Sequence, residues 1–291
     1  MESFEQIDIE NNRIKELLEK MKLKQLNLQE YSELQMLLLR REASFSNSYP
    51  LSRIAVLGDK IMFLADTHSG NGRAEKLEFL DIAYNNALKQ NIKAVIHAGD
   101  LTEACPVEHD KKFEIVLQEL LKAYAHMPNE IITGLVLGNH DYSAIRTHPS
   151  VIPYYFNTSK IFVLGMQQVL LNWGDINILV SHPVSQLTMA EDGHTLADII
   201  IEGHHHKFDF HEDERKIDLP SASRDALGFL VSSLYDKYRQ KYSRLFLTAS
   251  KQDENIVLFE IYSIECNRFE DIIPTDTIEL NTKTKQLRLY K

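Results

Sequence analysis

Five short apolar segments of this chain end in residues of the kinds that bind metals, and this recurrence constrains the fold more than any other feature. The first three segments alternate with amphipathic helical patterns, which is typical of parallel strands joined by crossover helices. Because such α/β sheets place their sites at the carboxyl ends of the strands, we expect the polar side chains to gather at one edge of the protein. They are Asp66 and His68, Asp100, Asn139 to Asp141, His182, and His204 to His206.

The strands of this repeat are predicted at 60–65, 94–98 and 131–137, with helices at about 77–88 and from Pro106 onward. A strand at 54–57 is separated from the first of these only by Gly58 and Asp59, and this spacing predicts a β-hairpin. After Pro153 the patterns favour strands, with one further helix. These later elements are predicted at 161–164, 168–173, 176–180, 198–202, 245–248, 256–264, 277–280 and 287–290 for the strands and about 224–242 for the helix.

The N-terminal part of the chain has a different character. Residues 11–41 contain no glycine or proline and carry two helical stripes of apolar side chains, which predicts a helical hairpin. Asn27 and Glu30 have the spacing of a capping box at the start of the second helix. We therefore expect a helical appendage at 1–47, which serves packing or forms a homodimer, and one domain at 48–291.

The composition is that of an ordinary soluble protein, and several classes of protein are disfavoured. No apolar segment has the length of a membrane span, and no secretory signal precedes the first helix. The chain has two cysteines, too few for a disulfide framework, so a reducing cytoplasm is the expected location. A net charge of −10 argues against a general nucleic-acid binder, although bound cations would reverse the field near a metal site.

The residue types at the strand ends point to a particular chemistry. Imidazole nitrogens and carboxylate oxygens together suit transition metals such as Mn²⁺, Fe, Co or Zn²⁺. Their number exceeds the four ligands of one tetrahedral zinc and suits two cations that share a bridging ligand. Two cations a few ångströms apart can activate a water molecule and hold the oxygens of a phosphoryl group during an in-line displacement.

In chain order these residues form the series Asp-x-His, Gly-Asp, Gly-Asn-His-Asp, His and Gly-His-x-His, which resembles the motif series of the calcineurin-like metallophosphoesterase superfamily. The motifs span Asp66 to His206, and with the C-terminal strands the resemblance extends from Ile54 to the end of the chain. It implies an α/β fold of four layers, in which two packed mixed β-sheets are flanked by helices. The N-terminal helical hairpin would be an addition to this fold.

The resemblance also implies a role for each motif residue. A hydroxide that bridges two divalent cations would attack phosphorus, with Mn²⁺ as the first expectation and Fe, Zn, Co or Ni as alternatives. The implied ligands are Asp66, His68 and His206 for the first cation, Asn139, His182 and His204 for the second, and Asp100 as the bridge between them.

Two motif residues are implied to act without binding a cation. His140 would contact the phosphate and protonate or stabilise the leaving oxygen. Asp141 would orient His140 through its ring N–H. His205, which lies between two implied ligands, is expected to point away from the cations. His97 is expected to be structural, because it lies on a buried strand.

The expected activity is hydrolysis of phosphomonoesters or phosphodiesters, with a small phosphoester or a nucleotide as the favoured substrate. The acidic run Glu212 to Glu214 follows the last ligands closely and would repel a long polyanion. The alternative is a nuclease acting on DNA or RNA, because basic and aromatic residues interleave at 235–244, but there the tyrosines also fit the packed face of a helix. A non-catalytic metal-binding scaffold is a further alternative. Such proteins usually lack some of the ligands, whereas this chain keeps all of them.

Overall fold

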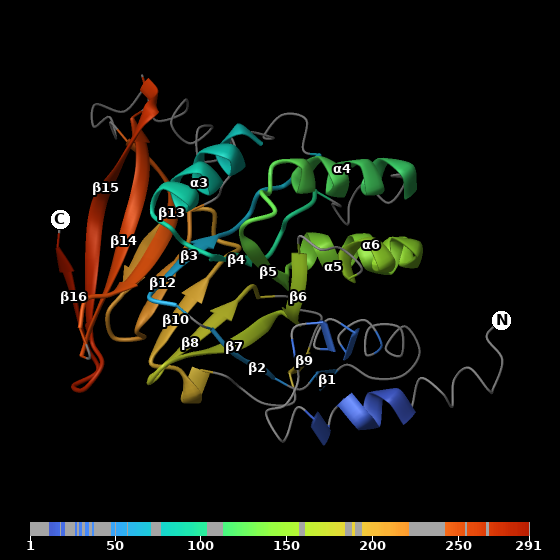
Figure 1. Ribbon diagram of the computed structural model, residues 1–291, viewed down its shortest axis with the longest axis horizontal. Coiled ribbons are helices and arrows are strands. Elements are labelled where there is room, and N and C mark those ends of the chain that lie inside the picture. Colours follow the sequence, from blue (N-terminus) through green and yellow to red (C-terminus); the bar gives the residue numbers. More distant parts are fainter. Residues whose placement is uncertain are drawn as a thin grey trace.

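Strands and helices alternate in the first half of the described chain, and strands dominate its second half (Figure 1). The computed structural model describes residues 12–17, 19–20, 27, 29–30, 33–34, 37, 48–49, 51–56, 58–70, 77–103, 113–156, 161–183, 188–189, 194–220, 242–253, 255–265 and 268–290. The predicted helix start at Pro106 lies outside these residues, as does the predicted helix at 224–242 up to residue 241.

The larger of the two main sheets has eight strands in the order β16-β15-β14-β13-β3-β4-β5-β6. Its parallel half contains β3 (Lys60–Leu64), β4 (Ala94–Ala98), β5 (Ile132–Leu137) and β6 (Ile161–Met166). Its antiparallel half contains β13 (Tyr242–Lys251), β14 (Ile256–Glu265), β15 (Arg268–Asn281) and β16 (Gln286–Tyr290). The halves join where β13 pairs with β3, so the C-terminal strands support the strand that leads to Asp66.

The smaller main sheet has six strands in the order β11-β12-β10-β8-β7-β2. Its strands are β2 (Ser52–Ala55), β7 (Gln168–Trp173), β8 (Ile176–Ser181), β10 (Ile199–Glu202), β11 (Asp209–His211) and β12 (Lys216–Asp218). The expected hairpin between β7 and β8 is present as an antiparallel pair. A separate parallel pair joins β1 (Ser48–Tyr49) to β9 (Thr188–Met189).

Two hydrophobic cores form on the two faces of the larger sheet. Along β3, Met62 and Leu64 belong to a cluster with the helices, whereas Ile61 and Phe63 belong to a cluster between the sheets. This alternation follows from the period of two in a strand, and it requires a strand that is apolar on both faces. The expected architecture of two packed mixed sheets flanked by helices is therefore confirmed.

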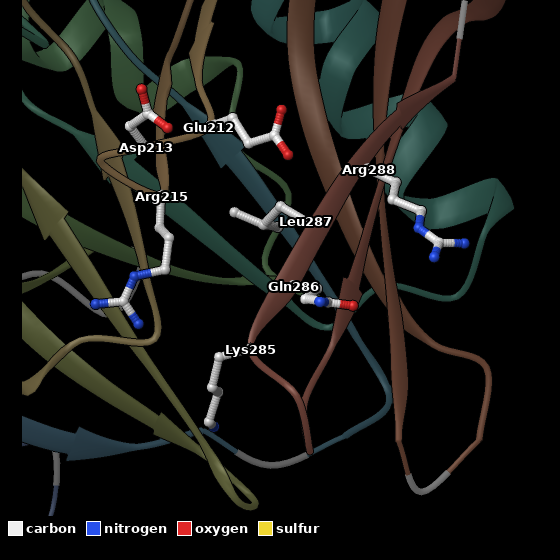
Figure 2. A pocket seen from close by; sticks show the side chains of 7 residues that line it. All are labelled: Glu212, Asp213, Arg215, Lys285, Gln286, Leu287 and Arg288. Carbon is white, nitrogen blue, oxygen red and sulfur yellow. The ribbon is translucent and has the colours of Figure 1, made fainter.

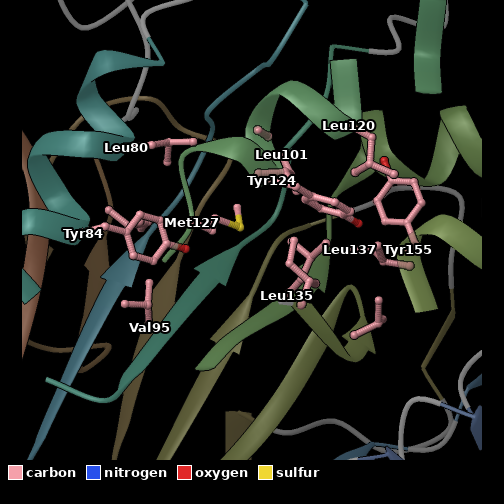
Figure 3. Close-up of a cluster of buried hydrophobic side chains, with 14 of the residues drawn as sticks. Leu80, Tyr84, Val95, Leu101, Leu120, Tyr124, Met127, Leu135, Leu137 and Tyr155 are labelled. Atoms are coloured by element: carbon pink, nitrogen blue, oxygen red, sulfur yellow. The ribbon is translucent and has the colours of Figure 1, made fainter. Parts of the chain in front are cut away.

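The helices cover the outer face of the larger sheet (Figure 1). They are α3 (Glu78–Lys89), α4 (Phe113–Ala125), α5 (Asn139–Thr147) and α6 (Ile152–Phe156), with a 3-10 turn at Pro149–Val151. A second 3-10 turn, His194–Leu196, packs against the smaller sheet. Side chains of α3 and α4 face those of β4 and β5 across this core (Figure 3). Among the described helices, none combines the length and the apolar character that a membrane crossing demands.

The predicted hairpin between 54–57 and 60–65 is wrong. β2 pairs with β7 in the smaller sheet, whereas β3 pairs with β4 and β13 in the larger one. β3 is buried on both faces and has a partner strand on each side. β2 instead lies at the edge of the smaller sheet and alternates between buried and exposed residues. The short connection therefore carries the chain from one sheet to the other, with Gly58 at a φ of +101°.

The described residues between 12 and 37 are mostly helical, and they resemble the expected hairpin. The apolar side chains of Ile14, Leu17, Leu34 and Leu37 form a small core of their own. The capping box is confirmed, because the Glu30 N–H donates to the Asn27 side chain at 2.9 Å and the Asn27 N–H donates to the Glu30 carboxylate at 3.1 Å. The domain boundary at 47/48 and a homodimer remain predictions.

Trp173 lies between the two sheets and links them to the β2–β3 connection. Its ring is fully buried, its indole N–H donates to the Gly58 carbonyl at 2.6 Å, and Lys251 Nζ lies 4.8 Å from the ring centroid. We predict that Trp173→Phe lowers the free energy of unfolding by about 2 kcal/mol, because it removes the N–H donor and leaves space in the core. Urea denaturation followed by circular dichroism measures this.

The matched control is Lys251→Met, which keeps the indole and removes only the cation over its ring. This variant should lose less than about 1 kcal/mol. Equal losses in the two variants would contradict the assigned role of the indole hydrogen bond.

Candidate metal centre

The polar residues predicted for the site do meet at one edge of the protein. β3, β4 and β5 deliver the first three groups from the larger sheet, and β8 and β10 deliver the others from the smaller sheet. Each group directly follows the carboxyl end of its strand. The structure thereby brings together Asp66, His68, Asp100, Asn139, His140, His182, His204 and His206.

One cluster of donor atoms contains Asp66, His68 and His206. The Nε2 atoms of His68 and His206 lie 3.1 Å apart, and His206 Nε2 lies 3.3 Å from Asp66 Oδ1. His68 Nε2 lies 3.9 Å from the same oxygen. Donors bound at about 2.1 Å to one cation are roughly 3.0 to 3.4 Å apart, so this spacing suits a single ion.

A second cluster contains Asp100, Asn139, His182 and His204. Asn139 Oδ1 lies 3.0 Å from His182 Nε2 and 3.1 Å from His204 Nδ1. His182 Nε2 lies 3.1 Å from Asp100 Oδ2. The other ring nitrogen of His182 donates to the Ala98 carbonyl at 2.7 Å, which fixes the tautomer that leaves Nε2 available as a ligand.

The two clusters adjoin at Asp100. The donor atoms of His68, Asp100 and His140 lie within 4.8 Å of one another, so Asp100 is close to a residue of each cluster. The His140 N–H also donates to Asp100 Oδ1 at 2.8 Å. The arrangement can therefore accommodate two neighbouring cations with a carboxylate between them.

The backbone at this edge adopts an uncommon conformation. Nine non-glycine residues of the described chain have positive φ, between 48° and 80°. Five of these nine belong to the two clusters: Asp66, His68, Asp100, His204 and His206. Left-handed conformations disfavour L-amino acids and concentrate at functional sites, where surrounding structure maintains them.

Hydrogen bonds between the β3 and β4 loops maintain these conformations. The N–H groups of Asp66, His68 and Ser69 donate to the carbonyls of Gly99, Asp100 and Leu101 at 3.0, 3.0 and 2.9 Å. From the smaller sheet, the His204 N–H donates to both carboxylate oxygens of Asp66, at 3.2 and 3.0 Å. Each loop therefore holds the next one in place.

Three glycines of the motifs allow the loops to approach so closely. A Cβ atom at Gly99 would collide with the ring of His182, and one at Gly138 would collide with the carboxylate of Asp100. A Cβ atom at Gly203 would collide with the Ala98 carbonyl. These glycines are needed because ligand side chains or strand backbone occupy the space.

Asp100 and His182 shift each other's pKa within the centre. Burial alone would raise the pKa of the Asp100 carboxyl, but the rings of His182, His140 and His68 hold that pKa well below its usual range. Burial alone would lower the pKa of His182, but Asp100 raises it to about 9. Because metal binding requires the neutral ring, a cation at Nε2 of His182 would compete with the proton that Asp100 favours.

Asp141 does not orient His140, contrary to the expectation. Its buried carboxylate accepts hydrogen bonds from the N–H groups of Leu101 at 3.1 Å, Thr102 at 3.1 Å and Gly138 at 3.2 Å, and from the Tyr155 hydroxyl at 3.2 Å. The reason is that α5 begins at Asn139, so Asp141 lies in its first turn and faces back toward the start of the helix. Asp141 therefore joins the loop that carries Asp100 to the loop that carries Asn139.

Glu103 is the carboxylate that lies near His140, and the sequence reasoning missed it. Glu103 Oε2 lies 2.6 Å from His68 Nδ1, and Glu103 Oε1 lies 3.7 Å from His140 Nδ1. The sequence does offer a signal for it, because Glu103 comes only three residues after Asp100. Its segment runs alongside the residues that follow β3. Ser69 and Thr102 form a β-bridge there, and the Glu103 N–H donates to the Ser69 carbonyl at 2.8 Å.

Two further histidines occupy the surroundings of the centre. His205 turns to Glu202, with 3.1 Å between Nε2 and Oε1, and thus away from Asp66 and Asp100 as expected. His97 is fully buried, and its Nε2 lies 2.7 Å from the hydroxyl of Thr67, the residue between Asp66 and His68. Burial lowers the pKa of His97 to about 4, so this ring is neutral.

A surface pocket of about 470 Å³ lies away from the centre, between the β11–β12 turn and β16 (Figure 2). Glu212, Asp213, Arg215 and Lys285 are among its lining residues. Lys216, at the start of β12, is paired with Ile200 near the start of β10, so the turn lies at the end of the sheet opposite to His204. The acidic run therefore lies at the other end of the sheet from the proposed ligands, and its expected effect on a polyanionic substrate stays a prediction.

A family model described as the calcineurin-like phosphoesterase superfamily domain matches residues 60–220. No curated protein sequence matches.

Among solved structures, the E. coli phosphoesterase Yfce has 13% identity and a TM-score of 0.40, with 77% of this chain and 99% of that chain covered. The NAD nucleotidase of Haemophilus influenzae has 11% identity and a TM-score of 0.31, with 79% of this chain and 51% of that one covered. A protein serine/threonine phosphatase of Saccharomyces cerevisiae has 13% identity and a TM-score of 0.34, with 95% of both chains covered.

The position of Asp141 generates a prediction about stability. Asp141→Asn places an NH₂ group against backbone N–H donors, so we expect the free energy of unfolding to fall by about 3 kcal/mol and the bound metal to decrease. Thermal denaturation and metal analysis of the desalted protein measure both effects. Tyr155→Phe is the matched control, because it removes one donor, keeps the carboxylate and should cost about 1 kcal/mol. An Asp141→Asn protein with unchanged stability and metal content would contradict this assignment.

Proposed function

Because the chain belongs to the calcineurin-like phosphoesterase superfamily, and is thus a metal-dependent phosphoester hydrolase, we propose that it hydrolyses small phosphomonoesters or phosphodiesters at a dinuclear metal centre. The observation that carries the proposal is the pair of adjoining donor clusters with Asp100 between them. The proposed ligands are Asp66, His68 and His206 for one cation, Asn139, His182 and His204 for the other, and Asp100 for both.

The donor set suits two transition-metal cations better than one hard cation. Four ligands are imidazoles and one is an amide, and such neutral donors favour Mn²⁺, Fe, Zn²⁺ or Co²⁺ over Ca²⁺. Mn²⁺ is the first choice for assay. When bound, the two cations would neutralise charge on the phosphoryl group and lower the pKa of a water molecule placed between them.

His140 is the proposed catalytic residue of the chain itself. Its Nε2 lies 3.9 Å from Asp100 Oδ2, so the ring stands beside the position proposed for the cations. The ring is partly exposed, with 17% of the side chain accessible, which allows contact with a substrate. In this position His140 can hold a phosphoryl oxygen and donate a proton to the leaving oxygen.

Glu103 is proposed to position both His140 and His68. A carboxylate near Nδ1 keeps a proton on that nitrogen, and this favours binding of a cation by His68 through Nε2. Burial lowers the pKa of His68, but the contact with Glu103 and the charges of Asp100 and Asp66 raise it overall. The two imidazoles thereby share one orienting carboxylate.

A small substrate is favoured by the net charge of −10, which disfavours long-range attraction of a nucleic acid. The acidic run lies at the opposite end of the sheet, so its effect on a polyanionic substrate stays a separate prediction. The nuclease alternative depends on the basic and aromatic residues at 235–244, and 235–241 lie outside the described part of the chain. An assay with a nucleic-acid substrate therefore has to decide it. A nucleotide satisfies the same requirement for a small anionic ester.

We predict metal-dependent turnover of p-nitrophenyl phosphate and bis-p-nitrophenyl phosphate by the chelator-stripped protein after addition of Mn²⁺. Asp100→Asn should reduce kcat/KM by at least about 10³-fold, because it removes the charge shared by the two clusters. The ratio of the two substrates distinguishes a monoesterase from a diesterase, and single-stranded DNA serves as the test for a nuclease.

His140→Ala tests the proton donor in the same assay. Its kcat should fall by about 10²-fold or more, and the loss should be larger for phenyl phosphate than for p-nitrophenyl phosphate, because the poorer leaving group needs the proton more. A protein that binds two cations and hydrolyses none of these esters would instead support the scaffold alternative.

We also predict that Glu103→Gln reduces kcat by roughly tenfold and weakens metal binding by a similar factor. The exposed Glu130→Gln is the matched control and should leave both values unchanged. An effect confined to stability, with kcat and metal affinity retained, would contradict a positioning role.

A further inference from the structure

A second group of polar side chains lies on the smaller sheet, next to the metal centre but separate from it. We propose that Glu202, His205 and Asp218 form a third, mononuclear binding site for a divalent transition-metal cation such as Zn²⁺. Their donor atoms lie within 4.8 Å of one another. The residues come from the end of β10, the following loop and the end of β12.

Sheet register brings the two carboxylates together. Glu202 and Asp218 are partners in the parallel pairing of β10 with β12, so their side chains emerge side by side. Both residues are buried, at 6% and 4% relative exposure. Buried carboxylates that lie next to each other require a cation, because their desolvation and mutual repulsion are both unfavourable.

One oxygen of each carboxylate is held from outside the cluster. The Ser181 hydroxyl donates to Glu202 Oε2 at 2.9 Å, and His211 Nε2 lies 2.9 Å from Asp218 Oδ2. Such outer contacts orient the ligands of metal sites, and here they leave the second oxygen of each carboxylate facing His205 and Lys216.

The other oxygens face the interior of the cluster. Glu202 Oε1 lies 3.1 Å from His205 Nε2, which is close to the separation of roughly 3.4 Å between two ligands of a tetrahedral zinc. Asp218 Oδ1 is buried and has no hydrogen-bond partner. A buried carboxylate oxygen without a hydrogen bond, next to a carboxylate and an imidazole, is a position where a cation would be stabilised.

The ammonium group of Lys216 lies next to the two carboxylate oxygens that face the cluster. Its Nζ lies 3.3 Å from Glu202 Oε1 and 3.4 Å from Asp218 Oδ1, outside hydrogen-bonding geometry for the second oxygen. Nζ also lies 3.8 Å from Glu214 Oε2, whose side chain is exposed. The lysine can therefore move its charge to Glu214 when a metal ion binds, and it serves as the counter-charge when none is bound.

This site differs from the dinuclear centre in every ligand. Its proximity has a structural consequence, because His205 lies between His204 and His206, and Glu202 lies two residues before His204. A cation held by Glu202 and His205 would fix the loop that carries two proposed ligands of the centre. The third site is thus expected to support the centre without entering the reaction.

The test is the metal content of the full chain. Chelator-stripped protein is loaded with Zn²⁺, desalted and analysed by mass spectrometry for the number of ions per chain. His205→Ala and Asp218→Asn should each lose one ion equivalent relative to the unsubstituted chain. Lys207→Ala is the matched control, since Lys207 is exposed and adjacent in sequence, and its metal content should be unchanged.

Lys216→Met separates a metal site from a permanent ion-pair network. Removal of the ammonium should tighten binding at the third site by roughly tenfold, because a competing positive charge is lost. The proposal is overturned if His205→Ala and Asp218→Asn keep the full metal content, or if Lys216→Met leaves the affinity unchanged. The test is independent of the proposed function. If the dinuclear centre binds no metal, the number of ions per chain falls equally in all variants, and the third site still accounts for a difference of one ion.

Discussion

Backbone strain at the strand ends is the constraint on which the site depends. In an extended strand, side chains alternate between the two faces and those on one face stand parallel, so Asp66 and His68 would share a face without converging on one point. A left-handed residue breaks this alternation. This left-handed conformation occurs at Asp66, His68, Asp100, His204 and His206. Because each such residue is unfavourable by about 1 kcal/mol or more, the loops need many contacts to maintain it.

The two sheets supply those contacts, and the motif glycines determine how close they come. The β3 loop bonds to the β4 loop through three backbone hydrogen bonds, and the β10 loop bonds to Asp66 through the His204 N–H. Gly203 lies against Ala98 and Gly99 lies against His182, so two of the closest contacts between the sheets are made at glycines. The interface between the sheets and the metal centre are therefore one structural unit. A substitution in the inter-sheet core should then be felt at the ligands as well as in stability.

Much of the fold was predictable because it follows from periodicity. Strands buried on both faces read as continuous apolar runs, and the strand ends identified the residues that meet at one edge. The choice of partner strand was not predictable in the same way. Nothing local distinguishes the Gly58-Asp59 connection between two sheets from a hairpin turn, because the difference lies in the remote strands β7 and β13. The same holds for the acidic run, which a short hairpin returns to the far end of the sheet.

The misassignment of Asp141 has a physical explanation as well. Asp141 follows His140 directly in the sequence, which suggested that the two side chains interact. In the first turn of a helix, however, adjacent residues project about 100° apart. Asp141 therefore faces the backbone donors of Gly138, Leu101 and Thr102, and Glu103 reaches His140 from another strand end. Position at the strand ends predicted which proposed ligands come together, whereas adjacency in the chain did not identify the carboxylate next to the His140 ring.

Asp141 and Glu103, two carboxylates next to the proposed ligands, differ in their neighbours. Burial and the charge of Asp100 raise the pKa of Asp141, and the backbone N–H donors around its carboxylate oppose that shift. Glu103 has imidazoles as its neighbours. Burial lowers the pKa of His68, but the contact with Glu103 is first among the interactions that raise it overall. With only Asp66 and Asp100 as anionic ligands, two divalent cations would leave a positive field where a phosphoryl group binds. Such a centre would attract an anionic ester.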